Sequence, residues 1–394
     1  MFFLEMLVFI SLLALAGTYL IYPLFFYLLK QIIKNGSQVA TDNLPAVALI
    51  VSLSNENEMT LQRALDNRLQ LDYPRDKLTL VFAADGSSEA GREVLKENKA
   101  GIRLFEFTER QGKTGVLNSV IPALNSEVLV FSDVNSLYHQ SALKKLVRHF
   151  SNPGIGGVCG ELRYVDTDIP DVTGKVSNVY LKYEKLVKAS ESKVSTLTIF
   201  NGAIYAIRRH LHQEMNPQAA NDFQHPIQIV LQGYKSVYEP EAVAYEQAVK
   251  NDSVEFQRTV RITARGWKGM FTYLSLLNPF KTGLFSLQFV FRKLLRWLGP
   301  ILMIALFVSS YFLKEQLLYL IIFWAQASFY LLALAGWLLR NQSLNKVVYY
   351  PYYFCLVNIA ALKGLVIALS GKDTAKWVPS EVMASKADDK RSGW

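Results

Sequence analysis

The stretch EVLVFSDVNSLY, Glu127 to Tyr138, decides the expected fold. Its apolar run is typical of a buried strand, and Asp133 and Asn135 follow at the point where that strand ends. A carboxylate at the end of a buried strand costs free energy unless a partner compensates it. The stretch is therefore either a strand-end turn or a site that holds a metal ion, and the surrounding sequence has to decide between them.

The same order of strand, polar end and helix recurs on the N-terminal side of this stretch. Buried strands are predicted over Ala46–Leu53 and Leu78–Ala84, and a further strand in IRLFEFTE (102–109). The segments MTLQRALDNRLQ, GREVLKENKA and GKTGVLNSVIPAL have helical patterns. Strands that alternate with helices predict a parallel, doubly wound α/β sheet, in which ligands bind beyond the carboxyl ends of the strands. Three polar clusters, SNEN, DGSS and SDVN, lie at those ends and predict one shared crevice.

Later segments continue the α/β pattern toward a basic region. Residues 171–196 are typical of a long amphipathic helix. TIFNGAIYAIRR reads as a strand with a glycine at its centre, and YKSVYEPEAVAYE as another strand. Residues 254–275 carry several arginines among apolar residues, a pattern suited to the membrane surface.

Long apolar runs flank the α/β region. They occupy residues 1–29, 297–313, 316–339 and about 348–370, and about 20 apolar residues are enough to cross a bilayer. The expected organisation is an N-terminal transmembrane anchor (1–33), an α/β domain (40–250), an amphipathic membrane-interface segment (251–295), C-terminal transmembrane helices (296–370) and a polar tail (371–394).

The first apolar run is interpreted as a retained anchor. A cleaved signal peptide is the alternative, because Ala14-Leu15-Ala16 resembles a cleavage site. No basic residue precedes the run, however, and the run continues well past Ala16. Both observations favour the anchor.

Basic residues beside the apolar runs place the α/β domain in the cytoplasm by the positive-inside rule. They are Lys30, Lys34, Arg292, Lys293 and Arg296. The lysine-rich tail also favours the cytoplasm, whereas three full spans after the domain would place it outside. Residues 348–370 are therefore expected either to span the membrane or to lie in its interface. KDTAKWVPSE (372–381) is a candidate flap over the active site.

Charge and cysteine content narrow the functional class. The net charge of +9 fits a positive-inside bias and attraction to anionic lipid, and no nucleic-acid-binding module is recognisable. The chain has two cysteines, Cys159 and Cys355, so neither a disulfide framework nor a zinc site is expected.

Each polar strand end has a structural explanation beside a functional one. Asp85 precedes Gly-Ser and either forms an Asx turn or accepts hydrogen bonds from a base or ribose. Gly112-Lys113 precedes a helix and either caps it or contacts a phosphate, although the P-loop pattern is absent. Asp133 and Asn135 would face the same side of an extended chain and offer two oxygen ligands to Mg²⁺ or Mn²⁺, unless the stretch is a turn.

Two further motifs also have both a structural and a functional explanation. Asp222, in NDF, is either a helix N-cap or a general base that takes a proton from an attacking hydroxyl. Arg258, Arg261 and Arg265 form either a cationic membrane-surface face or a clamp for a diphosphate.

Taken together and in this order, these motifs resemble the membrane-embedded family 2 glycosyltransferases. That group includes hyaluronan, chitin-oligosaccharide, cellulose and poly-N-acetylglucosamine synthases. The resemblance covers about residues 46–270, with apolar runs in the expected places. Within that group, the chain is most similar to a bacterial branch with a Phe-Ser-Asp-Ala-Asn type motif. The segments that carry this likeness are FSDVN, NGAIYAIRR, NDF, YEPEAVAYE and EFQRTVRITARG.

The resemblance implies a GT-A fold inserted between transmembrane helices, with interface helices, in the bacterial cytoplasmic membrane. It implies a nucleotide-sugar donor, a lipid-linked or saccharide acceptor, contact with membrane lipids, and Mg²⁺ or Mn²⁺ as cofactor. It assigns base contacts to Ser52 and Leu53, a ribose contact to Glu56, and a base or ribose contact to Asp85. It places Lys113 near the nucleotide and assigns metal and diphosphate binding to Asp133 and Asn135. It places Gly202 at the border of the acceptor, makes Asp222 the catalytic base, and assigns diphosphate or acceptor contacts to Gln257, Arg258, Arg261 and Arg265.

Two departures from the family pattern bear on the type of transfer. Asn135 replaces the second Asp of Asp-x-Asp, and no Trp follows the arginine in the Gln-x-x-Arg-Trp position. The resemblance predicts an inverting transfer from a nucleotide-sugar donor, expected to be UDP-linked, to a lipid-linked or saccharide acceptor in cell-surface polysaccharide biosynthesis. A processive synthase that secretes its polymer, and a catalytically degenerate sugar-nucleotide-binding protein, remain the alternatives.

Overall fold

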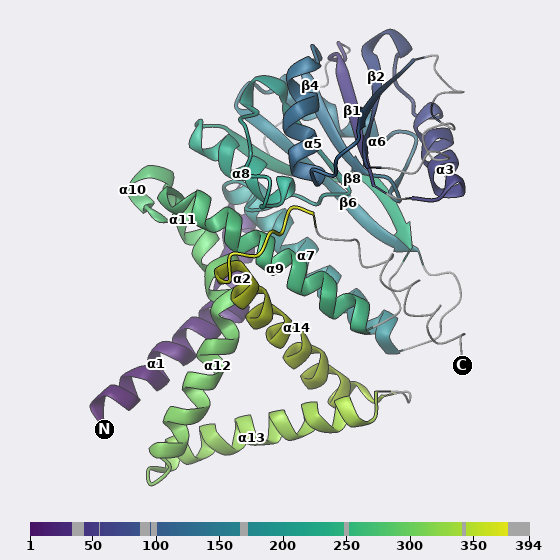
Figure 1. Cartoon of the computed structure of the whole chain (residues 1–394). Coiled ribbons are helices and arrows are strands. Elements are labelled where there is room, and N and C mark those ends of the chain that lie inside the picture. The colour runs from purple at the N-terminus through teal and green to yellow at the C-terminus, as the bar shows by residue number, and fades with distance from the viewer. Residues whose placement is uncertain are drawn as a thin grey trace, which may run out of the picture.

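The structure is a computed structural model that describes residues 1–33, 43–54, 56–86, 95, 101–165, 172–247, 252–340 and 344–376, with side chains left aside in 172–180. The helix predicted in GREVLKENKA and the tail beyond residue 376 lie outside this description. The centre of the fold is one eight-stranded sheet (Figure 1). Its strands are β1 (Val47–Leu53), β2 (Leu78–Asp85), β3 (Ile102–Phe107), β4 (Val128–Asp133), β5 (Leu137–Tyr138), β6 (Ile155–Val165), β7 (Ile204–Arg208) and β8 (Lys235–Gln247).

The sheet is mixed, with the order β3-β2-β1-β4-β7-β6-β8-β5. The first four strands in this order run parallel, as the alternating pattern predicts. The prediction of an entirely parallel sheet is wrong, because β7 enters antiparallel to both β4 and β6, and β5 pairs antiparallel with β8. The carboxyl end of β4 therefore lies beside the start of β7, where Ser132 pairs with Ile204.

Strand β6 has no counterpart among the predicted elements, and its glycines explain why. A Cβ added at Gly157 would lie 2.6 Å from the Phe200 ring, and one at Gly160 would lie 2.6 Å from the Ala242 carbonyl oxygen. Glycine weakens a strand pattern and marks close approach of neighbouring groups. In NGAIYAIRR the glycine also differs from its predicted place, because Gly202 precedes β7 in a turn in which Asn201 accepts from the Ala203 amide.

Helices cover both faces of the sheet and connect it to the apolar part of the molecule (Figure 1). Buried clusters on the two faces hold it together: one includes Leu65 and Leu146, the other Val116 and Ile229. The helices of this part are α3 (Glu58–Leu69), α5 (Lys113–Val120), α6 (Ala142–Val147), α7 (Val172–Val194), α8 (Asn221–Leu231) and α9 (Asp252–Thr272). The predicted amphipathic segments correspond to α7 and α9, which lie between the sheet and the apolar helices.

Four stretches of the described residues are long and apolar enough to cross a membrane: Phe2–Ile32, Leu284–Phe312, Leu317–Leu338 and Lys346–Leu369. The first stretch consists of α1 (Phe2–Ala16), η1 (Gly17–Ile21) and α2 (Tyr22–Ile32). The second consists of α11 (Leu284–Phe289), η7 (Val290–Leu294) and α12 (Leu295–Phe312). The third and fourth are α13 (Leu317–Leu338) and α14 (Lys346–Leu369). The short α10 (Pro279–Thr282) comes directly before α11. In Figure 1, α14 runs back toward the sheet, and it packs along α9.

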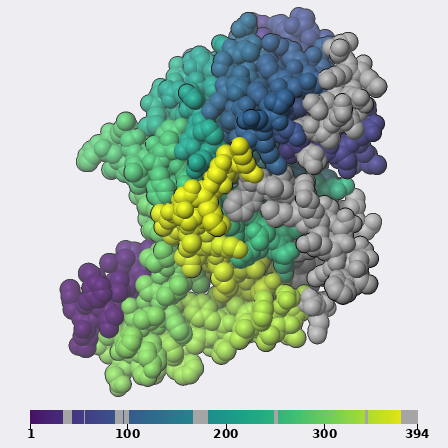
Figure 2. Space-filling view, viewed as in Figure 1, coloured from purple at the N-terminus to yellow at the C-terminus, as the bar shows by residue number. Residues whose placement is uncertain are grey.

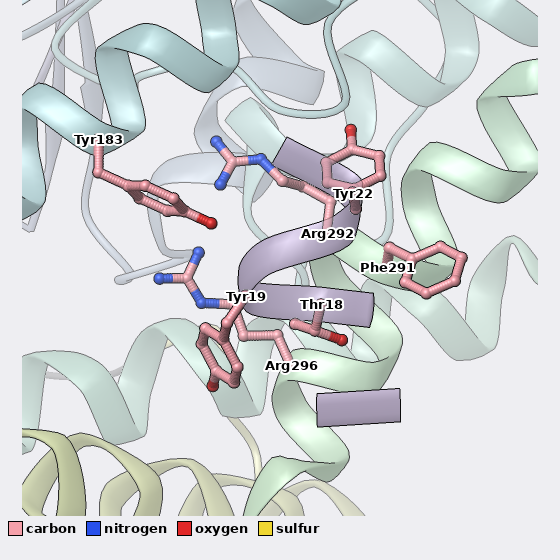
Figure 3. A pocket seen from close by; sticks show the side chains of 7 residues that line it. All are labelled: Thr18, Tyr19, Tyr22, Tyr183, Phe291, Arg292 and Arg296. Atoms are coloured by element: carbon pink, nitrogen blue, oxygen red, sulfur yellow. The ribbon is translucent and has the colours of Figure 1, made fainter. Parts of the chain in front are cut away.

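The N-terminal helix meets α7, η7 and α12 at a junction of buried polar contacts, and Figure 3 shows Tyr22, Arg292 and Arg296 of this junction. Arg292 contacts Glu184 at 2.7 Å and Glu191 at 3.0 Å, Arg296 contacts Glu184 at 2.8 Å, and the Tyr22 hydroxyl donates to Glu191 at 2.5 Å. Two π-helical turns, η1 and η7, meet here, and Gly17 has no room for a side chain because of Phe291. A crevice of about 10 Å³ remains at this junction, which is room for one water at most.

Candidate active site

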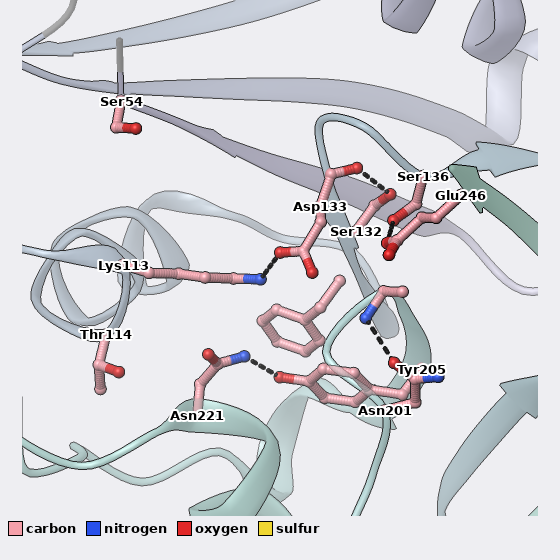
Figure 4. A network of polar contacts seen from close by, with 12 residues as sticks. Ser54, Lys113, Thr114, Ser132, Asp133, Ser136, Asn201, Tyr205, Asn221 and Glu246 are labelled. Atoms are coloured by element: carbon pink, nitrogen blue, oxygen red, sulfur yellow. Dashed lines mark hydrogen bonds and ion pairs between the residues drawn. The ribbon is translucent and has the colours of Figure 1, made fainter. Parts of the chain in front are cut away.

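Two carboxylates converge at the edge of the sheet where β4 ends and α8 begins. Asp133 is the last residue of β4, and Asp222 lies in the first turn of α8. Gly202 lies between these elements: a Cβ added there would be 3.7 Å from Asp133 Oδ2 and 3.4 Å from Asp222 Oδ2. Lys113, the first residue of α5, reaches Asp133 Oδ1 at 2.5 Å (Figure 4). The fold thus gathers residues from distant parts of the chain around one point.

The two carboxylates have different electrostatic surroundings. Burial raises the pKa of Asp222, and the negative charge of Asp133 raises it further. The cations Lys113 and Arg265 act in the opposite direction without cancelling the increase. Asp133 instead has a lysine in direct contact, and its side chain is 41% exposed. One acid is therefore paired with a cation at the crevice surface, and the other has increased proton affinity.

The Asp85 carboxylate accepts hydrogen bonds from the backbone of the loop that leads into α5. It is 4% exposed and accepts from the amides of Gln111 at 2.6 Å and Gly112 at 2.8 Å. Gly112 has a φ of +79°, a conformation that favours glycine. Asp85 therefore fixes the loop that carries Lys113 into the crevice.

The stretch after β4 is a turn and not an extended segment. Val134 and Asn135 form the turn, and the Ser136 amide donates to the Asp133 carbonyl at 3.3 Å. The expectation that Asp133 and Asn135 face one side of an extended chain is wrong in this respect, because the chain reverses to reach β5. Asn135 is exposed at the tip of the turn.

The residues of this turn fit a cation that is held jointly with substrate. Asp133 uses Oδ1 for Lys113 and keeps Oδ2 on the side of Gly202, and Asn135 adds an exposed amide oxygen. Within the described residues no group of three His, Cys, Asp or Glu side chains is placed to hold a metal by itself. Mg²⁺ and Mn²⁺ accept few protein oxygens and take water and phosphate oxygens for the rest.

A buried arginine that the sequence reasoning missed lies directly beneath this turn. Arg68 of α3 is 0% exposed and donates to the Ser132 hydroxyl at 2.8 Å, the Asp133 carbonyl at 3.0 Å and the Ser136 carbonyl at 2.5 Å. The pattern contains a signal for it, since Leu61, Leu65 and Arg68 follow one another at helical spacing on the buried face.

A second group absent from the predictions is a buried chain of hydrogen bonds behind Asp222. The Asn221 amide donates to the Tyr205 hydroxyl at 2.5 Å (Figure 4). That hydroxyl lies 2.9 Å from His225 Nδ1. The other ring nitrogen of His225 lies 3.1 Å from His212 Nδ1. Burial lowers the pKa of His225 well below its usual value and that of His212 to about 4. Both rings are therefore neutral near pH 7.

The α9 residues divide between the rim of the sheet and the floor of the crevice. Arg258 donates to the Tyr164 hydroxyl at 3.1 Å, at the end of β6. Arg265 donates to the Thr114 hydroxyl at 2.9 Å and the Ala219 carbonyl at 2.8 Å, beneath α5 and α8. Gln257 and Arg261 are half-buried on the same helix. Arg258 therefore lies against the end of β6 and Arg265 is fixed by protein groups between α5 and α8, and the contact of this series with a diphosphate stays a prediction.

The predicted nucleotide residues lie at the end of β1. Ser52 pairs with Ala83 of β2 and Asp133 of β4, and its hydroxyl is buried with no hydrogen-bond partner among the described residues. Leu53 is buried, and Glu56 accepts from the Ser54 amide at 2.7 Å. These residues lie at the carboxyl end of β1, beside β2 and its last residue, Asp85.

The C-terminal segment lies against the same loop. Thr374 is buried and donates to the Gln218 carbonyl at 2.7 Å, and the Ala375 carbonyl lies where a Gly112 side chain would project. In Figures 1 and 2 this segment leaves α14 and reaches the α/β part of the molecule. Residues 372–376 of the predicted flap are therefore adjacent to the crevice, and whether they move stays a prediction.

Comparison with known proteins identifies the family. A family model described as glycosyltransferase like family 2 matches residues 45–299. The chain belongs to glycosyltransferase family 2. This glycosyltransferase is 24% identical over 286 residues to the probable glycosyltransferase YdaM of Bacillus subtilis, an alignment that covers 68% of the chain and 67% of that protein. It is 28% identical to the O-antigen chain rhamnosyltransferase RfbN of Salmonella typhimurium, over 48% of the chain and 62% of that protein.

The predicted fold class is also confirmed. The family 2 glycosyltransferase superposes on the mannosyltransferase PcManGT from Pyrobaculum calidifontis, solved with GDP-Man and Mn²⁺, with a TM-score of 0.67 and 20% identity. That match covers 91% of this chain and 99% of PcManGT. The enzyme therefore has a GT-A-type fold with candidate transmembrane helices on both sides of it.

Proposed function

We propose that the enzyme is an inverting, membrane-bound glycosyltransferase of cell-surface polysaccharide biosynthesis. It would move a sugar from a nucleotide-sugar to a lipid-linked or saccharide acceptor at the cytoplasmic face of a bacterial inner membrane. The observation that carries the proposal is the convergence of Asp133 and Asp222 on Gly202, one acid paired with Lys113 and the other with a raised pKa.

The donor would bind at the carboxyl ends of β1, β2 and β4. Ser52, Leu53 and Glu56 would border the base and ribose, and Asp85 would act there through the loop that it holds. Lys113 would exchange its contact with Asp133 for the diphosphate. The unpartnered Ser52 hydroxyl supports a polar ligand at this edge.

Asp133 and Asn135 would hold a divalent cation together with the diphosphate. When bound, Mg²⁺ or Mn²⁺ would neutralise charge that develops on the leaving diphosphate. Gln257, Arg258 and Arg261 of α9 would add hydrogen bonds and positive charge along the same side. Arg265, with its protein partners Thr114 and Ala219, would hold the floor of the site. The metal in the PcManGT complex supports testing Mn²⁺ first.

Asp222 would act as the base. A carboxylate with a raised pKa is a better proton acceptor than one with the ordinary value. It would take the proton of the acceptor hydroxyl as that oxygen attacks the anomeric carbon and the diphosphate departs. A single displacement inverts the anomeric centre, so an α-linked donor would give a β product. Gly202 leaves room for the acceptor between the two acids.

The acceptor would arrive from the membrane side, past α9. Part of the chain, 29%, aligns with a beta-monoglucosyldiacylglycerol synthase of Trichormus variabilis at 26% identity, which supports a lipid acceptor. The absence of Trp after the α9 arginine supports a single or short-range transfer over a processive synthase. Formation of a polymer from purified enzyme and donor alone would contradict this choice.

The test is a donor screen followed by one substitution. Membrane-extracted protein would be incubated with UDP- and GDP-sugars and Mn²⁺ or Mg²⁺, and the released nucleotide measured with and without acceptor lipids. Asp222→Asn should reduce transfer by about 10²–10⁴-fold, a typical range for loss of a general base, while nucleotide binding persists. Asp72→Asn, at an exposed carboxylate paired with Lys144, is the control and should change nothing. Unchanged transfer by Asp222→Asn would overturn the assignment and favour a sugar-nucleotide-binding protein.

A further inference from the structure

The side chain of Arg68 is buried against the turn that would hold the donor phosphates. It belongs to the C-terminal turn of α3, on the face with Leu61 and Leu65, and is 0% exposed. One nitrogen, Nη2, donates to the Ser132 hydroxyl and to the carbonyls of Asp133 and Ser136. The guanidinium carbon also lies 5.3 Å from the centre of the Tyr138 ring. A single side chain thus contacts both ends of the turn.

The residue before Arg68 fixes the next part of the same segment. Asn67 donates to the Tyr138 carbonyl at 2.9 Å and accepts from the Tyr138 amide at 2.8 Å. The end of α3 therefore holds the backbone from Ser132 to Tyr138. Asn135, at the tip of the turn, is exposed.

Arg68 remains a cation in this position. Burial lowers its pKa to about 10, well above neutral pH. A charged donor makes stronger hydrogen bonds to carbonyls than a neutral donor does. Its other terminal nitrogen, Nη1, donates to Asn67 Oδ1 at 3.2 Å, so the guanidinium contacts Asn67 and the turn at once, which the single nitrogen of a lysine does not reproduce.

We propose that Arg68 is a positioning residue for the donor. It holds the Asp133–Ser136 turn in the one shape that brings Asp133 and Asn135 to the diphosphate, and so sets donor affinity without touching the substrate. This inference rests on the proposed function, because it takes that turn as the diphosphate-binding element.

The chain offers a matched control in Arg208. Its guanidinium donates to the carbonyls of Phe150, Asn152 and Ile155 at 2.7, 3.0 and 2.8 Å and lies 5.3 Å from the centre of the Phe150 ring. Arg208 therefore makes the same kind of contacts, but at the far end of β7, where it pairs with Val128 and not with the Asp133 end of β4. A loss that follows only from broken arginine–carbonyl contacts would be equal in the two variants.

The test compares Arg68→Lys with Arg208→Lys in the full chain in detergent. Binding of UDP and GDP would be measured by calorimetry with and without Mn²⁺, and the donor KM and kcat by nucleotide release. Arg68→Lys should weaken nucleotide binding and raise the donor KM by about tenfold, the effect of one lost charged hydrogen bond, while kcat changes less than about threefold. Arg208→Lys should bind like the wild type.

Three outcomes would overturn the proposal: wild-type binding by Arg68→Lys, an equal loss in both variants, or a loss confined to kcat. If Arg68→Lys does not accumulate as folded protein, Ser132→Ala removes one of its acceptors without a change of charge. That variant should weaken binding by about two- to fivefold, and unchanged binding would equally overturn the proposal. If the wild type binds nucleotide but transfers no sugar, the proposed function is wrong. The binding measurements on Arg68→Lys and Arg208→Lys would then still test the role of Arg68. Failure of the wild type to bind either nucleotide would defeat both.

Discussion

At the scale of single residues, the candidate site separates two tasks between two acids. Asp133 has Lys113 in contact and is suited to an anionic ligand that displaces or shares that lysine. Asp222 is shielded from solvent enough that its pKa is raised, which suits a proton acceptor. Two carboxylates in different surroundings can therefore take different roles within one crevice.

The pH dependence of transfer should report Asp222. The base must be ionised, so kcat/KM should fall as the pH decreases through a pKa above the ordinary aspartate value of 3.8. Lys113 is the strongest of the groups that lower this pKa. Lys113→Met should therefore move the acidic limb of the pH–rate profile to higher pH.

The control for this profile is Lys144→Met, since Lys144 pairs with the exposed Asp72. The acidic limb of that variant should coincide with the wild-type limb. An unmoved limb in Lys113→Met would mean that another group limits the rate at low pH.

Gly202→Ala should fold normally and transfer poorly. The nearest atom to the added methyl is Asp222 Oδ2 at 3.4 Å, an ordinary van der Waals distance, so thermal unfolding should be unchanged. The methyl would occupy the space between the acids and reduce kcat/KM by about 10–100-fold through misplacement of the substrate. Gly154→Ala, whose methyl would meet only the Asn152 side chain, should keep wild-type activity. Equal activity in both variants would exclude Gly202 from the acceptor border.

At the scale of elements, the sequence predicts most strands of the parallel half of the sheet. It predicts little of the path that the chain takes after those strands end. The apolar runs of β1, β2 and β4 are continuous, and local pattern alone identifies them. The shape after Asp133 depends on Arg68, which is distant in sequence, so local pattern leaves turn and extension equally open. Strand β6 was missed for a related reason, because Gly157 and Gly160 have meaning only beside Phe200 and Ala242.

The hydrogen-bond chain behind Asp222 should stabilise both the fold and the start of α8. His225→Leu would leave the Tyr205 hydroxyl and His212 without their buried partner, at a cost of about 1–3 kcal/mol for each unsatisfied group. The melting temperature should fall and kcat with it, as measured by thermal unfolding and nucleotide release. His225→Asn, whose amide oxygen can accept from Tyr205, should recover part of both.

His139 provides the control for this chain. It is exposed, and the hydrogen bonds of its ring within the described residues go to the nearby Ser141 side chain and amide. His139→Leu should change the melting temperature little. If His139→Leu lowered the melting temperature as much as His225→Leu does, the buried hydrogen bonds would not be the cause of the loss.

At the scale of the whole molecule, Arg292 of η7 joins the C-terminal apolar helices to α7 of the α/β part. Arg292→Met would leave Glu191 and part of Glu184 without their buried partner, and removal of one member of such a pair typically costs about 3–5 kcal/mol. Thermal unfolding in detergent should show this loss, and a second change, Glu191→Gln, should recover part of it. Lys144→Met, which breaks an exposed pair, should cost less than about 1 kcal/mol. Similar losses in both variants would contradict a buried clamp.

The meeting of η1 with η7 has a consequence for biosynthesis. Gly17 and Tyr22 leave the ribosome early, whereas Phe291 and Arg292 emerge only after the whole transferase domain. At the usual ~5–20 residues per second, Gly17 waits for tens of seconds before Phe291, which packs against it, exists. During that interval Glu191, the partner of the Tyr22 hydroxyl, lacks the Arg292 side chain that contacts it in the finished fold. Contact between η1 and η7 is therefore a late event, and a nascent chain that stops before residue 291 has Glu191 for Tyr22 but no Arg292 beside it.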